Sequence, residues 1–360
     1  MQRNRMVVLV GAMALVVGAT TFTRVLRPTG AGTHYPSDPR HLYAAVSQYL
    51  NEADVKPRDY RLVGLIAPSS GLQFCGSVAG HAYKLLKPGQ YDRVIVICPS
   101  HYAEFRGFSS ASVQYYRTPF GDVPVDEPAV RKLCHSSLFS QRSVVYRQDL
   151  YARGSRVGLH EREHGIEVTL PFLQLQLGEF RLVPIVAGEL QIAESGLDEK
   201  AVDSAVSTLR RVVTDRTLVV VSGNLTRVGL RYGYAPFRDN VAENVERLDA
   251  EALELIMNRD YSGFQEYIER TGNDLPARLP ISVLMKLLPS RARGVLLDYD
   301  SLARRTTDAT SSVSYAAVAF YDLARGPAEQ RPVRTLLSSP DPDGGAGNAG
   351  PAGEPIREEE

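Results

Sequence analysis

The stretch YDRVIVICPSHYAEFRGF, from Tyr91 to Phe108, contains the pattern that decides the fold. Its continuous apolar run, Val94 to Cys98, is typical of a strand buried on both faces in an α/β sheet. The run ends abruptly in Pro99-Ser100-His101. Because open α/β sheets bind their ligands at the carboxyl ends of the strands, His101 is a candidate functional residue.

Two further apolar runs end in polar loops in the same way. RLVGLIAP, residues 61–68, leads into Ser69, and TLVVVSGN, residues 217–224, leads through Asn224 to Arg227. The carboxyl ends of parallel strands meet at one edge of a sheet. The sequence therefore predicts one crevice, with a binding set of Ser69, Ser100, His101, Asn224 and Arg227.

Strand-like and helix-like segments alternate along most of the chain. Residues 41–53 form an amphipathic pattern that Asp38 precedes as a cap, residues 112–126 suggest an edge strand or hairpin, and residues 164–178 suggest one helix containing Pro171. This alternation predicts an α/β fold: a single α/β/α three-layer domain over residues 29–325, with a mostly parallel or mixed central sheet.

The two ends of the chain differ from this domain. Met6 to Phe22 is apolar and carries no charge, which suggests a single membrane-anchoring helix or a cleaved signal segment within residues 1–28. An anchor there would place the domain outside the cytoplasm. Residues 326–360 are rich in proline, glycine and acidic residues, which predicts a disordered tail.

Composition excludes several classes of function. Lysine plus arginine and aspartate plus glutamate both number 41, so the zero net charge gives no support for nucleic-acid binding. The three cysteines form no C-x-x-C pair, and no glycine-rich phosphate loop or G-x-S-x-G motif is present. Beyond His101, the residues suited to chemistry are His164 and Glu167, which a helix would place on one face. Their alternative role is a structural polar pair.

Taken together, these stretches resemble the Memo family, also called AmmeMemoRadiSam system protein B. The stretches that carry the resemblance are AGTHYPSDPRHL, IAPSSGLQFCGSVAGHAYKLL, VICPSHYAEFRGFSSASVQYYRTPFGDVPVD, REHGIEVTLPFLQ, LVPIVAG, VVVSGN and SSVSYAAVAFY. The resemblance implies a fold similar to class III extradiol dioxygenases and a site that uses iron or copper.

This chain departs from the family pattern at most of the positions linked to metal or substrate. Ser69 replaces a histidine, Asn224 and Arg227 replace an aspartate and a histidine, and a cysteine of some members falls near Pro276; His101 is kept. We therefore expect a membrane-tethered binding or scaffold protein without a metal cofactor, whose partner is a protein or a small anion. The sequence does not decide whether the chain is an enzyme, but the replacement of most of the family's metal-site residues argues against enzymatic activity. The alternative is an iron- or copper-dependent oxidoreductase or dioxygenase-like enzyme that uses His101, His164 and Glu167.

Overall fold

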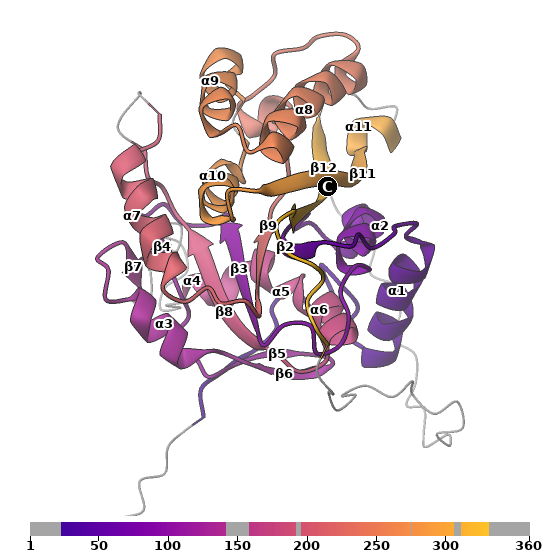
Figure 1. Cartoon of the computed structure of the whole chain (residues 1–360). Helices are drawn as coiled ribbons and strands as arrows, with labels where there is room; N and C mark the ends of the chain where they lie inside the picture. Colours follow the sequence, from indigo (N-terminus) through magenta and orange to yellow (C-terminus); the bar gives the residue numbers. More distant parts are fainter. Residues whose placement is uncertain (1–22, 142–157, 192–195, 274, 306–310, 331–360) are drawn as a thin grey trace, which may run out of the picture.

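A computed structural model describes residues 23–141, 158–191, 196–273, 275–305 and 311–330. Their main feature is a mixed sheet of nine strands (Figure 1). Its strands are β2 (Arg61–Ala67), β3 (Arg93–Pro99), β4 (Phe108–Ser109), β7 (Phe139–Ser140), β8 (Arg181–Ala187), β9 (Thr217–Ser222), β10 (Arg227–Val228), β11 (Ala292–Ser301) and β12 (Ser312–Asp322).

The centre of the sheet is parallel and its borders are antiparallel. The order is β10-β12-β2-β9-β3-β8-β4-β7, and β11 also pairs with β12. Strands β2, β9, β3 and β8 run parallel, whereas β12 and β4 join them in antiparallel orientation. The three apolar runs of the sequence are thus neighbouring parallel strands, as expected, and their carboxyl ends lie at one edge.

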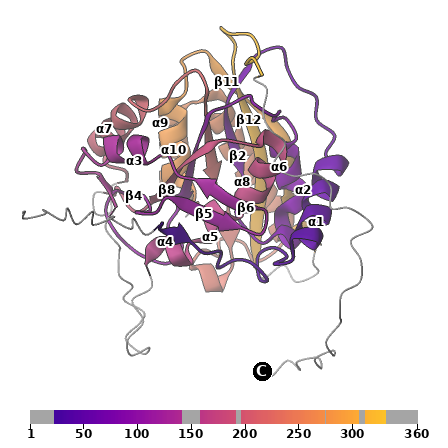
Figure 2. The ribbon, with the colours of Figure 1, turned by 90° about the horizontal axis from the view of Figure 1, so that it is seen from below.

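Helices cover both faces of this sheet, which confirms the α/β class and the mixed sheet (Figure 2). On one side, α2 packs on β2 and β12, with α1 and α6 against it; on the other, α10 packs on β3 and β9, with α7 beside it. The helices are α1 (Pro39–Glu52), α2 (Leu72–Tyr83), α3 (Glu127–Leu133), α4 (Leu159–Arg162), α5 (His164–Glu167), α6 (Leu170–Leu177), α7 (Glu199–Arg210), α8 (Val241–Asn258), α9 (Tyr261–Thr271), α10 (Arg278–Leu287) and α11 (Leu302–Arg305), with a 3₁₀ turn at Leu230–Tyr232.

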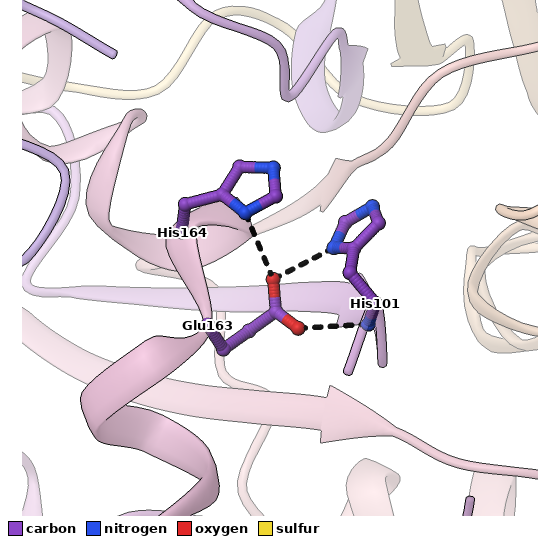
Figure 3. Close-up of side chains that lie close together, drawn as sticks. All are labelled: His101, Glu163 and His164. Carbon is purple, nitrogen blue, oxygen red and sulfur yellow. Dashed lines mark hydrogen bonds and ion pairs between the residues drawn. The ribbon is translucent and has the colours of Figure 1, made fainter. Parts of the chain in front are cut away.

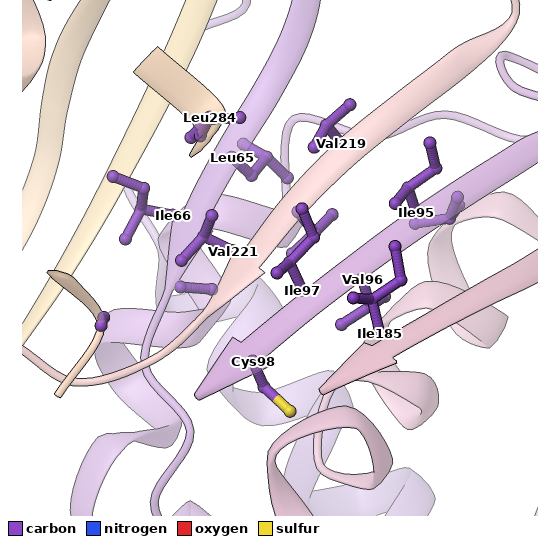
Figure 4. Packing of buried hydrophobic residues seen from close by; sticks show 14 of the residues in the cluster. Leu65, Ile66, Ile95, Val96, Ile97, Cys98, Ile185, Val219, Val221 and Leu284 are labelled. Atoms are coloured by element: carbon purple, nitrogen blue, oxygen red, sulfur yellow. The ribbon is translucent and has the colours of Figure 1, made fainter. Parts of the chain in front are cut away.

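The core lies between the central strands and these helices (Figure 4). Ile95 and Ile97 of β3 and Val221 of β9 have no exposed surface. Burial of each such side chain contributes about 1.5–3 kcal/mol to folding. In β2, Gly64 lets α10 come close, since a Cβ there would lie 3.2 Å from the side chain of Leu284. The strands that carry the candidate site are therefore held rigidly.

Two predicted boundaries need correction. The single helix expected over residues 164–178 is divided into α5 and α6: Val168 and Thr169 keep right-handed helical backbone angles, but Pro171 in the first turn of α6 has no N–H to donate. The segment expected to stay outside the fold, residues 1–28, already joins it at Val25. Val25 and Leu26 form β1 and pair in parallel with β5 (Tyr115–Thr118), and Leu26 is buried.

The predicted hairpin at residues 112–126 is confirmed, and it belongs to a second sheet. Strand β5 pairs with β6 (Gly121–Pro124), and with β1 they form a three-stranded sheet apart from the main one. The apolar stretch Met6–Phe22 and most of the predicted tail lie outside the described residues. Among the helices that are described, none has both the length and the apolar character needed to cross a bilayer.

Candidate functional site

The centre of the candidate site is a hydrogen-bonded pair of His101 and Glu163 (Figure 3). His101 follows β3, and its Nδ1 lies 2.7 Å from Oε1 of Glu163. The backbone N–H of His101 donates to Oε2 of the same carboxylate over 2.9 Å. The Glu163 side chain has no exposed surface, and that of His101 is 8% exposed. This double contact fixes both the position and the ring orientation of His101.

The local sequence explains why Glu163 points inward. It lies between the short helices α4 and α5 in extended backbone, and its Oε1 accepts a hydrogen bond from the N–H of Gly165. Gly165 packs tightly on the end of β3, because a Cβ there would lie 2.8 Å from Cβ of Cys98. Its carbonyl accepts a hydrogen bond from Ser222 of β9. The short helix α5 is therefore attached to two central strands.

The charge of Glu163 determines which nitrogen of His101 carries hydrogen. Burial opposes ionisation of Glu163, but the hydrogen bonds from His101 and the Coulombic effects of His101 and His164 together outweigh burial, and the pKa of the carboxyl is lowered. An ionised carboxylate only accepts hydrogen bonds, so Nδ1 of His101 must donate. In the neutral ring, Nε2 is then an acceptor. Nε2 is buried and has no hydrogen-bond partner within the described chain.

Two more histidines stack on His101. The ring of His164 lies 4.6 Å from that of His101 and 4.4 Å from that of His34, centroid to centroid. Burial lowers the pKa of His164 to about 3, and the charge that His101 carries when it is protonated adds to this shift; burial is also the main reason that the pKa of His34 is lowered. Both rings are therefore neutral near pH 7. Tyr102 contacts Nδ1 of His164 over 3.1 Å.

A cavity of about 550 Å³ lies at the carboxyl ends of β3 and β8. His101 and Ser100 form one wall, and Arg227 of β10 and Arg278 of α10 also line the cavity. Three exposed carboxylates, those of Glu104, Glu189 and Glu269, complete the charged lining. A second hollow of about 450 Å³ touches His34 and His164, so the histidine stack lies between two cavities.

The structure brings the five predicted binding residues together only in part. His101, Ser100 and Arg227 line the same cavity, but the Ser100 hydroxyl already donates to the carbonyl of Ala103. Ser69 and Asn224 do not line it. They are buried beside each other, with the N–H of Ser69 donating to Oδ1 of Asn224 over 3.0 Å.

Glu167, the predicted partner of His164, has a different set of contacts. Its carboxylate accepts hydrogen bonds from the N–H groups of Thr29 and Gly30 and from the hydroxyl of Tyr35. It thus attaches the loop after β1 to α5. Glu163 was not among the predicted site residues, although it directly precedes His164 in the stretch REHGIEVTLPFLQ, because one continuous helix would turn its side chain away from that of His164.

Comparison with known proteins gives the family. A sequence profile described as Memo-like protein matches residues 27–319. This chain belongs to the Memo family. Among its relatives, Protein MEMO1 of Mus musculus is 26% identical over 303 residues, which cover 81% of this chain and 95% of that protein. Protein MEMO1 of Xenopus laevis is 28% identical over 304 residues, with the same coverage.

Two more distant matches complete the comparison. Protein memo-1 homolog of Caenorhabditis elegans is 26% identical over 265 residues, covering 71% of this chain and 69% of that protein. Among solved structures, an uncharacterized protein of Escherichia coli K12 matches with a TM-score of 0.41 and 13% identity, covering 72% of this chain and 99% of that one.

The metal that the Memo resemblance implies finds a poor set of ligands here. His101, Glu163 and His164 have ligand atoms within 4.8 Å of one another. However, Nδ1 of His101 and Oε1 of Glu163 already form a hydrogen bond of 2.7 Å. Two ligands of one tetrahedral ion at about 2.1 Å would lie about 3.4 Å apart, so an ion would have to break this bond. The free nitrogen of His101 is Nε2, and a single imidazole does not hold an ion tightly.

Proposed function

We propose that this Memo-family chain is a binding protein whose crevice takes a small anionic ligand in place of a transition metal. The observation that carries the proposal is the fixed orientation of His101: Glu163 holds Nδ1, and Nε2, which is an acceptor in the neutral ring, is buried without a partner among the described residues and belongs to a residue of the cavity wall. The anionic group of the ligand contacts Arg227, and a hydroxyl or ammonium group donates to His101.

The charges around the cavity support an anion. The side chains of Arg227 and Arg278 are partly buried, whereas those of Glu104, Glu189 and Glu269 are exposed. Solvent screens exposed charges strongly and partly buried ones less. Arg227 also lies close enough to the site to lower the pKa of His164, after the larger effects of burial and of His101. A ligand within the cavity therefore meets two positive charges that solvent screens less than it screens the three carboxylates.

Calorimetric titration of the purified chain with acetate and with inorganic phosphate tests this proposal. The variant Arg227→Leu removes the cation, and we expect binding to weaken about 10- to 100-fold, because hydrogen bonds to charged groups contribute about 1.5–3 kcal/mol. Arg231→Leu is the matched control: Arg231 is exposed and does not line the cavity. Equal binding by the wild type and the Arg227 variant, or no binding by either, would contradict the proposal.

The alternative remains an iron- or copper-dependent oxidoreductase, and the observation in its favour is the cluster of His101, Glu163 and His164. For this cluster to hold an ion, the His101–Glu163 hydrogen bond must open. Stoichiometric iron or copper in the purified protein, lost in His101→Ala, would therefore replace the binding proposal with the enzyme.

We also propose that the chain is tethered to a membrane by the apolar stretch Met6–Phe22. The tether would leave the described domain on one side of the bilayer, because β1 enters the fold directly after it. Fractionation of cells that express the full chain and a chain starting at Thr23 tests this point. The full chain should sediment with membranes and need detergent for release, whereas the shorter chain should not. Release of the full chain by salt alone would contradict a spanning tether.

A further inference from the structure

A second acceptor lies on the wall of the same cavity. Asn273 follows α9, is 1% exposed and lines the cavity together with His101. Its Nδ2 donates to Oγ1 of Thr226 over 2.6 Å and to the hydroxyl of Tyr267 over 2.9 Å. Its Oδ1 is buried and has no hydrogen-bond partner among the residues described.

The hydrogen bonds behind Asn273 fix the orientation of its amide. The hydroxyl of Tyr267 donates to the carbonyl of Leu248, and the hydroxyl of Thr226 is hydrogen-bonded to the buried carboxylate of Asp249. Each hydroxyl has one hydrogen, so both can only accept from Asn273. The amide nitrogen must face these two hydroxyls, and Oδ1 must face away from them.

The cavity thus carries two acceptors of similar construction. Glu163 fixes the imidazole of His101 with Nε2 unpaired, which makes Nε2 an acceptor in the neutral ring, and Asp249, through Thr226, fixes the amide of Asn273 with the acceptor Oδ1 unpaired. A buried acceptor without a donor is destabilising, and a rigid one cannot turn to find a donor. The pair therefore selects a ligand that brings two hydrogen-bond donors.

The remaining lining narrows the class of ligand. Apart from His101, whose ring already stacks on that of His164, no described residue that lines the cavity has an aromatic ring, so a nucleobase could not be held between two rings. Leu190, Ile268 and Leu279 offer aliphatic contacts, and Arg227 and Arg278 offer positive charge. Hydroxyl groups on a short carbon chain with one anionic end match the two acceptors, the aliphatic wall and the cations.

We propose that the ligand of this cavity is a small polyhydroxylated anion, a sugar acid or a sugar phosphate, and that Asn273 and His101 recognise its hydroxyl groups. This inference rests on the proposed function, because it assigns a class to the anion that the crevice binds. It makes Asn273 a specificity-determining residue.

Calorimetry with the full-length chain in a mild detergent tests the inference with pairs of probes. Gluconate and hexanoate have the same carbon number and carboxylate, but only gluconate has hydroxyl groups. Ribose 5-phosphate and inorganic phosphate form the matching pair for a phosphate end. We expect one hydroxylated probe to bind at least 10-fold more tightly than its plain partner. The pair that shows this difference tells whether the anionic end of the ligand is a carboxylate, as in a sugar acid, or a phosphate, as in a sugar phosphate.

Variants of Asn273 and Thr226 then assign the preference. Asn273→Leu should remove most of the 10-fold preference, measured as the ratio of the affinities of the hydroxylated and plain anions in the same variant. Thr226→Val, which removes one of the two hydroxyl groups that hold the amide and also the contact of that hydroxyl with Asp249, should reduce the preference less and is the second test where the Leu variant does not fold. Asn258→Leu is the control, since Asn258 is exposed at the end of α8.

Two results would overturn the inference. If plain and hydroxylated anions bind equally well to the wild type, the two acceptors do not read hydroxyl groups, although the proposed function stands. If 6-aminohexanoate binds more tightly than gluconate, the donors come from an ammonium group and the assignment to hydroxyl groups is wrong. If no anion binds at all, the proposed function fails first.

Discussion

Replacement of Glu163 by glutamine is the perturbation that most directly tests how the site is held. The carboxylate accepts three hydrogen bonds, from the backbone N–H and Nδ1 of His101 and from the N–H of Gly165. Glutamine has one oxygen, so in either orientation at least one buried N–H faces its NH₂ group. A buried donor without a partner costs about 1–3 kcal/mol, and the other bonds lose the charge that strengthens them. We expect Glu163→Gln to reduce the free energy of unfolding by about 2–4 kcal/mol.

Urea unfolding followed by circular dichroism measures this loss, and ¹⁵N NMR of the imidazole reports the tautomer of His101. The matched control is Glu167→Gln, which removes the charge from a second buried carboxylate that binds Thr29, Gly30 and Tyr35. Both variants should lose stability. Only Glu163→Gln should change the ¹⁵N shifts of the His101 ring, because of these two carboxylates only Glu163 contacts that ring. Unchanged ring shifts in Glu163→Gln, or the same change in both variants, would refute the reasoning.

Three other predictions concern stability. Burial lowers the pKa of His160 to about 4, below the usual 6.5, so the unfolded chain binds this proton first as the pH falls. The stability that neutral His160 contributes is therefore present above about pH 6.5 and is lost toward pH 4, by at most about 1.4 kcal/mol per pH unit. His160→Gln should flatten this pH dependence of the free energy of unfolding. Gly165→Ala should cost about 1–3 kcal/mol in urea unfolding, because its Cβ would lie 2.8 Å from Cβ of Cys98. A chain that starts at Thr23 should be as stable as the full chain, whereas one that starts at Thr29 should unfold at lower urea because it lacks β1 and the buried Leu26; equal midpoints would show that β1 contributes nothing.

The fold could be predicted further than the site could. Buried apolar runs in the sequence predict β2, β3 and β9. The helical periodicity and the N-cap residue Asp38, which accepts hydrogen bonds from the N–H groups of Arg40 and His41, predict α1. Periodicity favours one helix over residues 164–178, and the interruption between α5 and α6 has a local cause, because Pro171 has no N–H to donate. What no local pattern shows is the tight packing of Gly165 on Cys98, which places α5 against the sheet.

The same limit applies to the candidate site. His101 could be found because it follows a strand, and Arg227 because it follows another. Glu163 and Asn273 were missed because the role of each depends on residues distant in sequence: the ring of His101 for Glu163, and the hydroxyl of Thr226 for Asn273. Such contacts are set by the three-dimensional packing and leave no periodic signal in the sequence.

The metal content of the purified chain tests the central claim most directly, and elemental analysis of the wild type, of His101→Ala and of a combined variant measures it. The combined variant carries Ser69→His, Asn224→Asp and Arg227→His, which restore the ligand types that the family resemblance implies at those positions. We predict far less than one equivalent of iron, copper or zinc in the wild type, with no change in His101→Ala, and a gain of metal in the combined variant. One equivalent of a transition metal in the wild type that is lost in His101→Ala would contradict the account.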